Sequence, residues 1–153
     1  MFGRLRSIRH PFYPDLRPTH ARAATGRHTV LAGHFEELEQ AAARGARATH
    51  AIFVLQEEGA CPATGRQRDR LWEWFCVPSF VLVLDGAGKV LAYECEAEEG
   101  LHVAADAGLA APDTSLCPCG RAGPRIGVAV RPQRQSARSL PLAHSLSGGS
   151  PAV

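Results

Sequence analysis

The sequence predicts a small α/β protein in which helices and strands alternate before a cysteine-rich turn. Three observations support this class. Two segments repeat apolar side chains at helical spacing, three short apolar runs have the length of strands, and Gly or Pro residues separate most of these segments. We therefore expect a partial α/β layer in the order helix, strand, helix, strand, strand, followed by a zinc-binding turn and with flexible termini.

The first helix–strand unit is expected in the first half of the chain. A helix over 34–47 is indicated because Phe35, Leu38 and two alanines recur on one face, and Gly45 can serve as its C-terminal cap. A strand is expected over 50–56, since HAIFVLQ is rich in β-branched and aromatic residues.

A second helix is expected over 62–76. Thr64 can cap its N-terminus, and Pro78 ends it because proline interrupts the helical hydrogen-bond pattern. The side chains expected on its buried side are Leu71, Trp72, Phe75 and Cys76.

Two strands are expected next, over 79–85 and 89–96, with Gly-Ala-Gly between them as a hairpin signal. The continuous apolar run 80–84 predicts a strand that is covered on both faces.

The distribution of charge suggests three regions. The net charge is +5 over 1–30, −7 over 31–110 and +4 over 111–153, which gives +2 for the 153 residues. Both ends lack hydrophobic periodicity. We therefore expect a basic, disordered arm over 1–28, an α/β domain with a zinc subdomain over 29–130, and a disordered tail over 131–153.

The composition also limits the compartment and the partners. No apolar run approaches the roughly 20 residues of a membrane span, and the charged, proline-containing start does not resemble a signal peptide. These features predict a cytoplasmic protein without a membrane partner. In a reducing compartment, the spacing of the five cysteines points to metal binding or chemistry rather than to disulfides.

Four residues form a candidate metal site. Structural zinc takes four Cys or His ligands, which usually come as two close pairs. One pair here is Cys95 with His102, and the other is Cys117 with Cys119 in a loop rich in Pro and Gly. The spacing is unusual for a zinc site, so the alternative that Cys95 is an ordinary buried cysteine in a strand stays open.

The other reactive residues point to no second site. Cys61 and Cys76 are expected to be structural, and the remaining histidines show no ligand-like spacing. The acidic run 94–99 is expected to be a solvated face. No catalytic or cofactor-binding residue is predicted.

Three segments resemble successive parts of the phenylacetate–coenzyme A ligase family, within the adenylate-forming ligases. They are RDRLWEWFCVPSF, KVLAYECEAEEGLHV and CPCGRAGPRIG, which together cover about residues 60–127 and require an internal deletion in the family pattern. The matching positions are Glu94, Cys95, Gly100, Leu101, His102, Asp106, Cys117, Cys119, Gly120, Arg121, Pro124 and Arg125. In some members of the family the matching cysteines and histidine bind structural zinc, so the resemblance implies the same four ligands as the spacing.

The sequence departs from the family at the residues that bind ATP. We find no Ser/Thr- and Gly-rich loop that would hold phosphates. VLVLDGAGKV stands where the family has a Tyr-Gly-x-Thr-Glu segment, and Asp85 is a poor substitute for the magnesium-binding glutamate. We expect no useful rate of phosphoanhydride chemistry without these groups.

Three functions follow as hypotheses. The first is a shortened ligase-like protein that keeps a structural zinc subdomain, lacks ATP-dependent activity, and acts as a scaffold or partner of a fuller ligase or another protein. The second is an active acid–CoA ligase (AMP-forming), with ATP and magnesium. The third is a zinc module that binds nucleic acid through its basic termini, although no aromatic residues are interleaved with the arginines there. A degraded remnant of a gene is a fourth reading.

Overall fold

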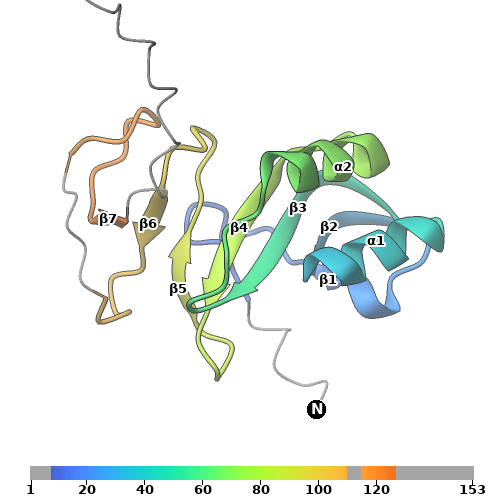
Figure 1. The fold of residues 1–153 in the computed structure, drawn as a ribbon, viewed down its shortest axis with the longest axis horizontal. Coiled ribbons are helices and arrows are strands. Elements are labelled where there is room, and N and C mark those ends of the chain that lie inside the picture. The colour runs from blue at the N-terminus through green and yellow to red at the C-terminus, as the bar shows by residue number, and fades with distance from the viewer. Residues whose placement is uncertain (1–7, 110–114, 127–153) are drawn as a thin grey trace, which may run out of the picture.

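A computed structural model describes residues 8–109 and 115–126. Its centre is a seven-stranded sheet in which the strands are ordered as they occur in the sequence (Figure 1). The strands are β1 (Thr19–His20), β2 (Arg27–Gly33), β3 (Arg47–Glu57), β4 (Ser79–Leu84), β5 (Val90–Tyr93), β6 (Leu101–Val103) and β7 (Arg125–Ile126). The first four are parallel, and β4 to β7 pair in antiparallel fashion.

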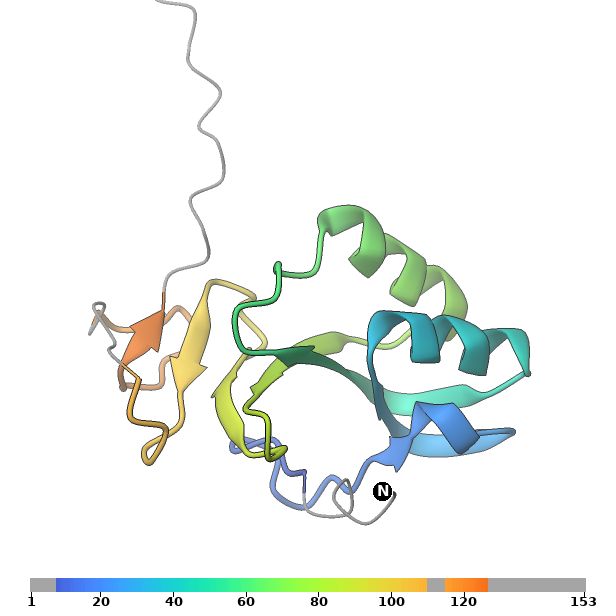
Figure 2. The ribbon, with the colours of Figure 1, turned by 60° about the horizontal axis from the view of Figure 1, so that its bottom comes forward.

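Two helices cover one face of the sheet. Helix α1 (Phe35–Ala43) connects β2 to β3, and helix α2 (Gly65–Phe75) connects β3 to β4. Crossover connections between parallel strands are right-handed, and β3 and β4 are each added at the same edge of the growing sheet. Both helices therefore lie on the same face of the sheet (Figure 2). Their buried side chains, including Leu38 and Leu71, form one core cluster with Ile52, Val54 and Val81.

The N-terminal segment covers the opposite face. Figure 2 shows this segment on the side of the sheet that the helices leave open. Ile8 is buried in a second core cluster with strand residues such as Phe53 and Leu82, and Tyr13 packs against this cluster. The disordered arm predicted over 1–28 is therefore wrong for the residues described from position 8 onward. They pack on the sheet and include β1, the 3-10 helix η2 (Ala21–Ala23) and the start of β2.

Most of the predicted elements are present with shifted ends. The structure has α1 and α2 inside the two predicted helices, Gly45 in the left-handed region (φ 84°) after α1, and Thr64 as the N-cap of α2. It confirms the β4–β5 hairpin. Strand β4 has buried residues in both core clusters, as expected for a strand covered on both faces.

The predicted buried side of α2 is partly wrong. Leu71 and Phe75 are buried, but Trp72 is 59% exposed and Cys76 is exposed. Trp74 takes the expected place of Trp72, because it packs against the first core cluster and against the ring of Phe35 on α1. Strands β1, β2, β6 and β7 were not predicted, and the tail predicted over 131–153 lies outside the residues described.

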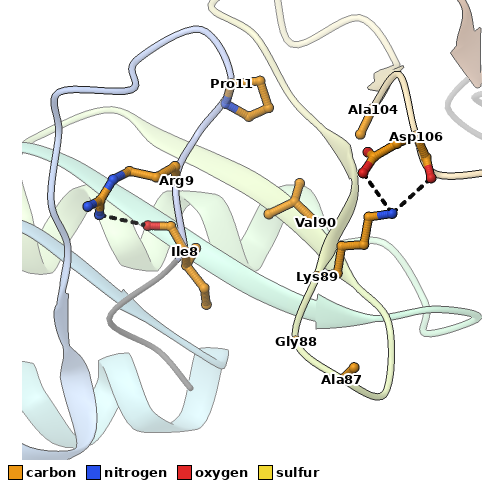
Figure 3. Close-up of a pocket in the computed structure, with 9 residues that line it drawn as sticks. All are labelled: Ile8, Arg9, Pro11, Ala87, Gly88, Lys89, Val90, Ala104 and Asp106. Atoms are coloured by element: carbon orange, nitrogen blue, oxygen red, sulfur yellow. Dashed lines mark hydrogen bonds and ion pairs between the residues drawn. The ribbon is translucent and has the colours of Figure 1, made fainter. Parts of the chain in front are cut away.

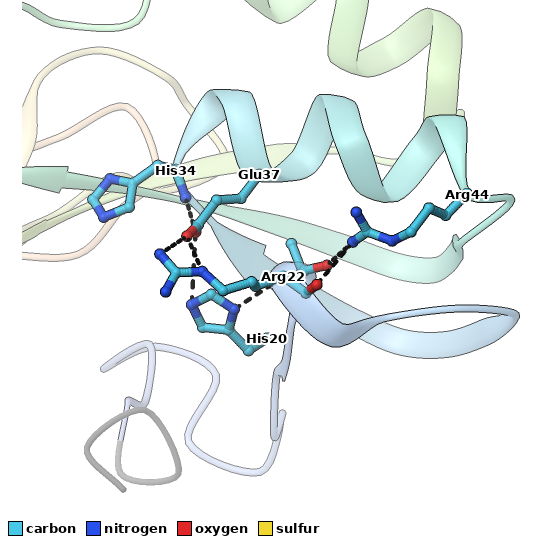
Figure 4. A network of polar contacts seen from close by, with 6 residues as sticks. His20, Arg22, His34, Glu37 and Arg44 are labelled. Carbon is cyan, nitrogen blue, oxygen red and sulfur yellow. Dashed lines mark hydrogen bonds and ion pairs between the residues drawn. The ribbon is translucent and has the colours of Figure 1, made fainter. Parts of the chain in front are cut away.

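A polar network joins η2 to the start of α1 (Figure 4). The carboxylate of Glu37 accepts hydrogen bonds from the backbone N–H of His34 (3.1 Å) and from Arg22 Nε (2.9 Å). Gly33 allows this approach, since a Cβ at this position would lie 2.8 Å from the Cβ of Ala21. The network therefore fixes the edge of the sheet that is farthest from β7.

None of the helices in the described part of the chain is long and apolar enough to cross a membrane.

His10 is a polar residue that packs against aromatic rings of the second core cluster and is fully buried there. Its Nε2 is 2.6 Å from the carbonyl oxygen of Glu94, which only accepts, and its Nδ1 accepts from the N–H of Phe12 (3.1 Å). These partners select the neutral ring with the proton on Nε2. Burial accordingly lowers the pKa of His10 to about 4.

We predict that His10 makes the protein sensitive to acid. The unfolded chain takes up a proton near pH 6.5, whereas the folded chain does so only near pH 4, so the free energy of unfolding falls as the pH falls between these values. The shift corresponds to about 3 kcal/mol. Denaturant unfolding at several pH values should show that His10→Gln, which keeps a donor but does not titrate, lacks this component. A wild-type and a variant curve that run parallel from pH 7 to 4.5 would contradict the prediction.

Candidate metal centre

The four predicted ligands come from three places at one end of the sheet. Cys95 lies two residues after the end of β5, His102 is in the middle of β6, and Cys117 and Cys119 lie in the loop before β7. Antiparallel pairing places Tyr93 of β5 opposite His102, and His102 opposite Arg125 of β7. The pairing of three short strands thus brings two distant parts of the sequence together.

The geometry of the four ligand atoms fits a tetrahedral site. All four atoms lie within 4.8 Å of one another. The Sγ atoms of Cys95 and Cys117 are 3.6 Å apart, and Cys119 Sγ is 3.5 Å from His102 Nε2. A tetrahedral ion with metal–sulfur bonds of about 2.3 Å and a metal–nitrogen bond of about 2.0–2.1 Å requires separations of roughly 3.5–3.8 Å. Two of the six separations in the cluster, Cys95–Cys117 and Cys119–His102, meet this requirement.

Two tight backbone turns present the sulfur atoms. The N–H of Glu98 donates to the carbonyl of Cys95 (3.0 Å), and the N–H of Gly120 donates to the carbonyl of Cys117 (2.8 Å). Gly120 has a φ of 81°, a value that favours glycine. Backbone N–H groups of Ala97 and Arg121 also hydrogen-bond to the sulfurs of Cys95 and Cys119, two residues before each. Such bonds stabilise a negatively charged thiolate, which is the form that binds a metal.

The centre is largely closed to solvent. Cys95, Cys117 and His102 are at most 2% exposed, and Cys119 is partly exposed. Burial raises the pKa of the Cys95 thiol to about 12, with further contributions from the thiols of Cys117 and Cys119. Burial, together with Arg125 and Arg121, lowers the pKa of His102, so its ring is neutral and able to donate a lone pair. The buried Cys95 thiol therefore needs a nearby cation to become a thiolate.

The structure brings all four predicted ligands into one cluster, and a metal ion of unspecified type fits it. Among the described residues it forms no second group of this kind. Cys61 and Cys76 are exposed and lie outside the cluster. Four protein ligands around one tetrahedral ion would leave no position for a reacting water, which a catalytic zinc requires.

Glu94 supports the centre from the side of the sheet, a role that the sequence did not indicate. The acidic run was expected to be solvated, but Glu94 is 2% exposed. Its carboxylate accepts from Arg68 Nη2 on α2 (2.6 Å) and from the N–H of Val81 (3.0 Å). Glu94 thereby connects α2 and β4 to the residue beside Cys95.

Further residues around the ligands were also not predicted. The Arg121 guanidinium donates to both carboxylate oxygens of Glu96 (2.7 Å each), and this contact lowers the pKa of Glu96 to about 2. Tyr13 donates to the same carboxylate, and the ring of Phe12 lies 4.8 Å from that of His102. No signal in the sequence shows that residues 12 and 13 approach the cysteines, because the contact depends on the tertiary fold.

Two surface hollows lie elsewhere. One of about 450 Å³ lies between the N-terminal segment and the β4–β5 hairpin, where Lys89 pairs with Asp106 (2.9 Å; Figure 3). Another of about 430 Å³ lies beside the start of α1 and the end of β3. None of the four candidate ligands lines either hollow.

Comparison of the sequence with models of known protein families and with curated proteins finds no match. The resemblance to the phenylacetate–coenzyme A ligase family therefore stays a prediction that rests on the motifs quoted above.

We predict that Arg68→Ala lowers the free energy of unfolding by about 2–3 kcal/mol. The change leaves the buried Glu94 carboxylate without its cation, and the cost is smaller than for a fully buried pair because Arg68 is 26% exposed. Arg66→Ala on the exposed side of α2 is the matched control and should change stability by less than about 0.5 kcal/mol.

Urea unfolding of both variants measures the difference. Adding Glu94→Gln to Arg68→Ala removes the unpaired charge and should recover part of the loss. Equal effects of Arg68→Ala and Arg66→Ala would contradict the interpretation.

Proposed function

We propose that this protein is a structural zinc-binding module without catalytic turnover at the metal. The observation that carries the proposal is the closed set of three cysteines and one histidine whose ligand atoms all lie within 4.8 Å of one another. Three sulfurs and an imidazole nitrogen are the donors that structural zinc prefers, whereas magnesium and calcium prefer oxygen.

The zinc would stabilise the part of the sheet that has the least other support. Strand β6 has three residues and β7 has two, and they end the sheet beyond β5. Neither α1 nor α2 packs over these two strands, as Figure 1 shows. An ion held by Cys95, His102, Cys117 and Cys119 would join β5, β6 and the loop before β7 at one point. In a domain of this size, metal binding contributes directly to folding.

We also propose that the chain is a shortened relative of the adenylate-forming ligases and lacks their ATP-dependent activity. The three quoted motifs support the relationship. The position of Asp85 supports the loss of activity, since its Oδ1 accepts from the N–H groups of Ala87 (2.8 Å) and Lys89 (2.9 Å). Its carboxylate thus closes the hairpin after β4, at the place where the family has its magnesium-binding segment.

A scaffolding role beside a fuller ligase or another protein follows from this proposal. The alternatives are an active acid–CoA ligase and a zinc module that binds nucleic acid. ATP binding distinguishes the first alternative, and a salt-dependent affinity for nucleic acid distinguishes the second.

We predict one zinc per chain in the purified protein. Cys117→Ser should lose the metal and lower Tm by about 10 °C or more, because three remaining ligands leave a buried site incomplete. Cys61→Ser changes an exposed cysteine outside the cluster, so it should keep both metal and Tm. Elemental analysis gives the stoichiometry, and cobalt substitution gives the thiolate-to-metal absorption that reports on the ligand set.

Isothermal titration with ATP and magnesium completes the test. No heat is expected from the zinc-loaded protein. A wild-type protein that stays free of zinc in zinc-supplemented medium would overturn the structural role, and clear ATP binding would favour the ligase alternative.

A further inference from the structure

A turn of the N-terminal segment packs against the proposed metal centre. Residues 10–13, named here the N-terminal turn, are closed by a hydrogen bond from the N–H of Tyr13 to the carbonyl of His10 (2.9 Å). The bond from His10 to the carbonyl of Glu94 fixes the turn beside Cys95, although 84 residues separate the two partners. The turn contributes no metal ligand, but its side chains contact the residues that surround the ligands.

Phe12 packs where the two parts of the metal centre meet, namely the part with Cys95 and His102 and the loop with Cys117 and Cys119. Its ring centroid is 4.8 Å from that of His102 on β6 and 4.9 Å from that of Tyr93 on β5. The guanidinium of Arg121, two residues after Cys119, lies 4.2 Å from the same ring. One aromatic ring therefore contacts β5, which precedes Cys95, β6, which carries His102, and the loop that carries Cys119.

Tyr13 contacts the same junction through hydrogen bonds. Its hydroxyl donates to Glu96 Oε2 (2.9 Å), and Arg121 donates to both oxygens of that carboxylate. Glu96 follows Cys95 directly in the sequence. The N-terminal turn, Glu96 and Arg121 thus form a continuous outer layer that joins Cys95 to the loop of Cys119.

We propose that the N-terminal turn controls how fast the centre releases its metal. A ligand leaves the ion only when the loop of Cys117 and Cys119 moves away from Cys95 and His102. This movement breaks the contacts of Phe12 and Tyr13. Cys119 is the ligand that is partly exposed, and its Sγ lies 3.5 Å from the His102 ring against which Phe12 packs. Competing ligands therefore enter beside the His102 ring against which Phe12 packs.

The inference rests on the proposed zinc site and assigns the regulation of that site to residues outside the ligand set. Outer residues that orient metal ligands typically change metal affinity 10- to 100-fold when they are replaced. By linkage, anything that displaces the N-terminal turn also weakens metal binding, and loss of the metal weakens docking of the turn.

The test measures the rate at which zinc passes from the folded, zinc-loaded full chain to an excess of a chromogenic chelator. Phe12→Ala should release zinc at least tenfold faster than wild type while still binding one zinc per chain. Phe12→Tyr keeps the ring and should release zinc within about twofold of the wild-type rate. Tyr13→Phe removes only the hydroxyl contact to Glu96 and should give an intermediate rate.

Leu16→Ala is the matched control. Leu16 lies in the same N-terminal segment and packs against the second core cluster, and it takes no part in the ring contacts and side-chain hydrogen bonds described above for Phe12 and Tyr13. It should lower the free energy of unfolding without changing the release rate by more than about twofold. Equal rates for Phe12→Ala and wild type, or equal acceleration by Leu16→Ala, would overturn the proposal. A zinc-free wild type would instead overturn the metal site itself, so the two failures are distinguishable.

Discussion

The buried residue Glu94 connects the parallel part of the sheet to the metal centre. Its backbone N–H donates to the carbonyl of Val81, its carbonyl oxygen accepts from His10, and its carboxylate accepts from Arg68 and Val81. One residue therefore contacts β4, α2 and the N-terminal segment, and it directly precedes Cys95. A charge in this position is compatible with folding only because each of these partners is present.

The parallel half of the sheet and the metal centre are built on different physical principles. Strands β2 to β4 are long enough to bury apolar side chains on both faces, and two core clusters form there. Strands β6 and β7 bury few side chains of their own, so this end of the sheet depends on strand pairing and on charged contacts such as Arg121 with Glu96. The proposed structural metal would add support at this end of the sheet, whereas the end that carries the two core clusters would not need it.

The sequence predicted those elements whose signals lie within a few neighbouring residues, and it missed those that depend on contacts between distant residues. Helix α2 and the β4–β5 hairpin carry their own caps and turn residues, Thr64 and the Gly-Ala-Gly segment, and were predicted. The four ligands could be grouped because cysteine and histidine are rare and distinctive. Strand β2 was missed because only its second half, from Val30, is buried, and the basic residues before it resemble those of a disordered arm. The role of His10 depends on a contact with Glu94, which lies 84 residues away in the sequence. The roles of Phe12 and Glu94 also depend on tertiary contacts, and no local sequence pattern indicates them.

The strictly sequential order of the strands has a consequence for biosynthesis. A sheet in which each strand pairs with the one before it is dominated by contacts between neighbours in the chain, and such topologies can assemble progressively as the polypeptide leaves the ribosome. The N-terminal turn is the exception. Its binding partner, the carbonyl of Glu94, is synthesised 84 residues later. The hydrogen bond that fixes this turn beside the metal centre can therefore form only after Glu94 has been made, although the rest of the N-terminal segment has apolar partners on β2, β3 and β4 before then.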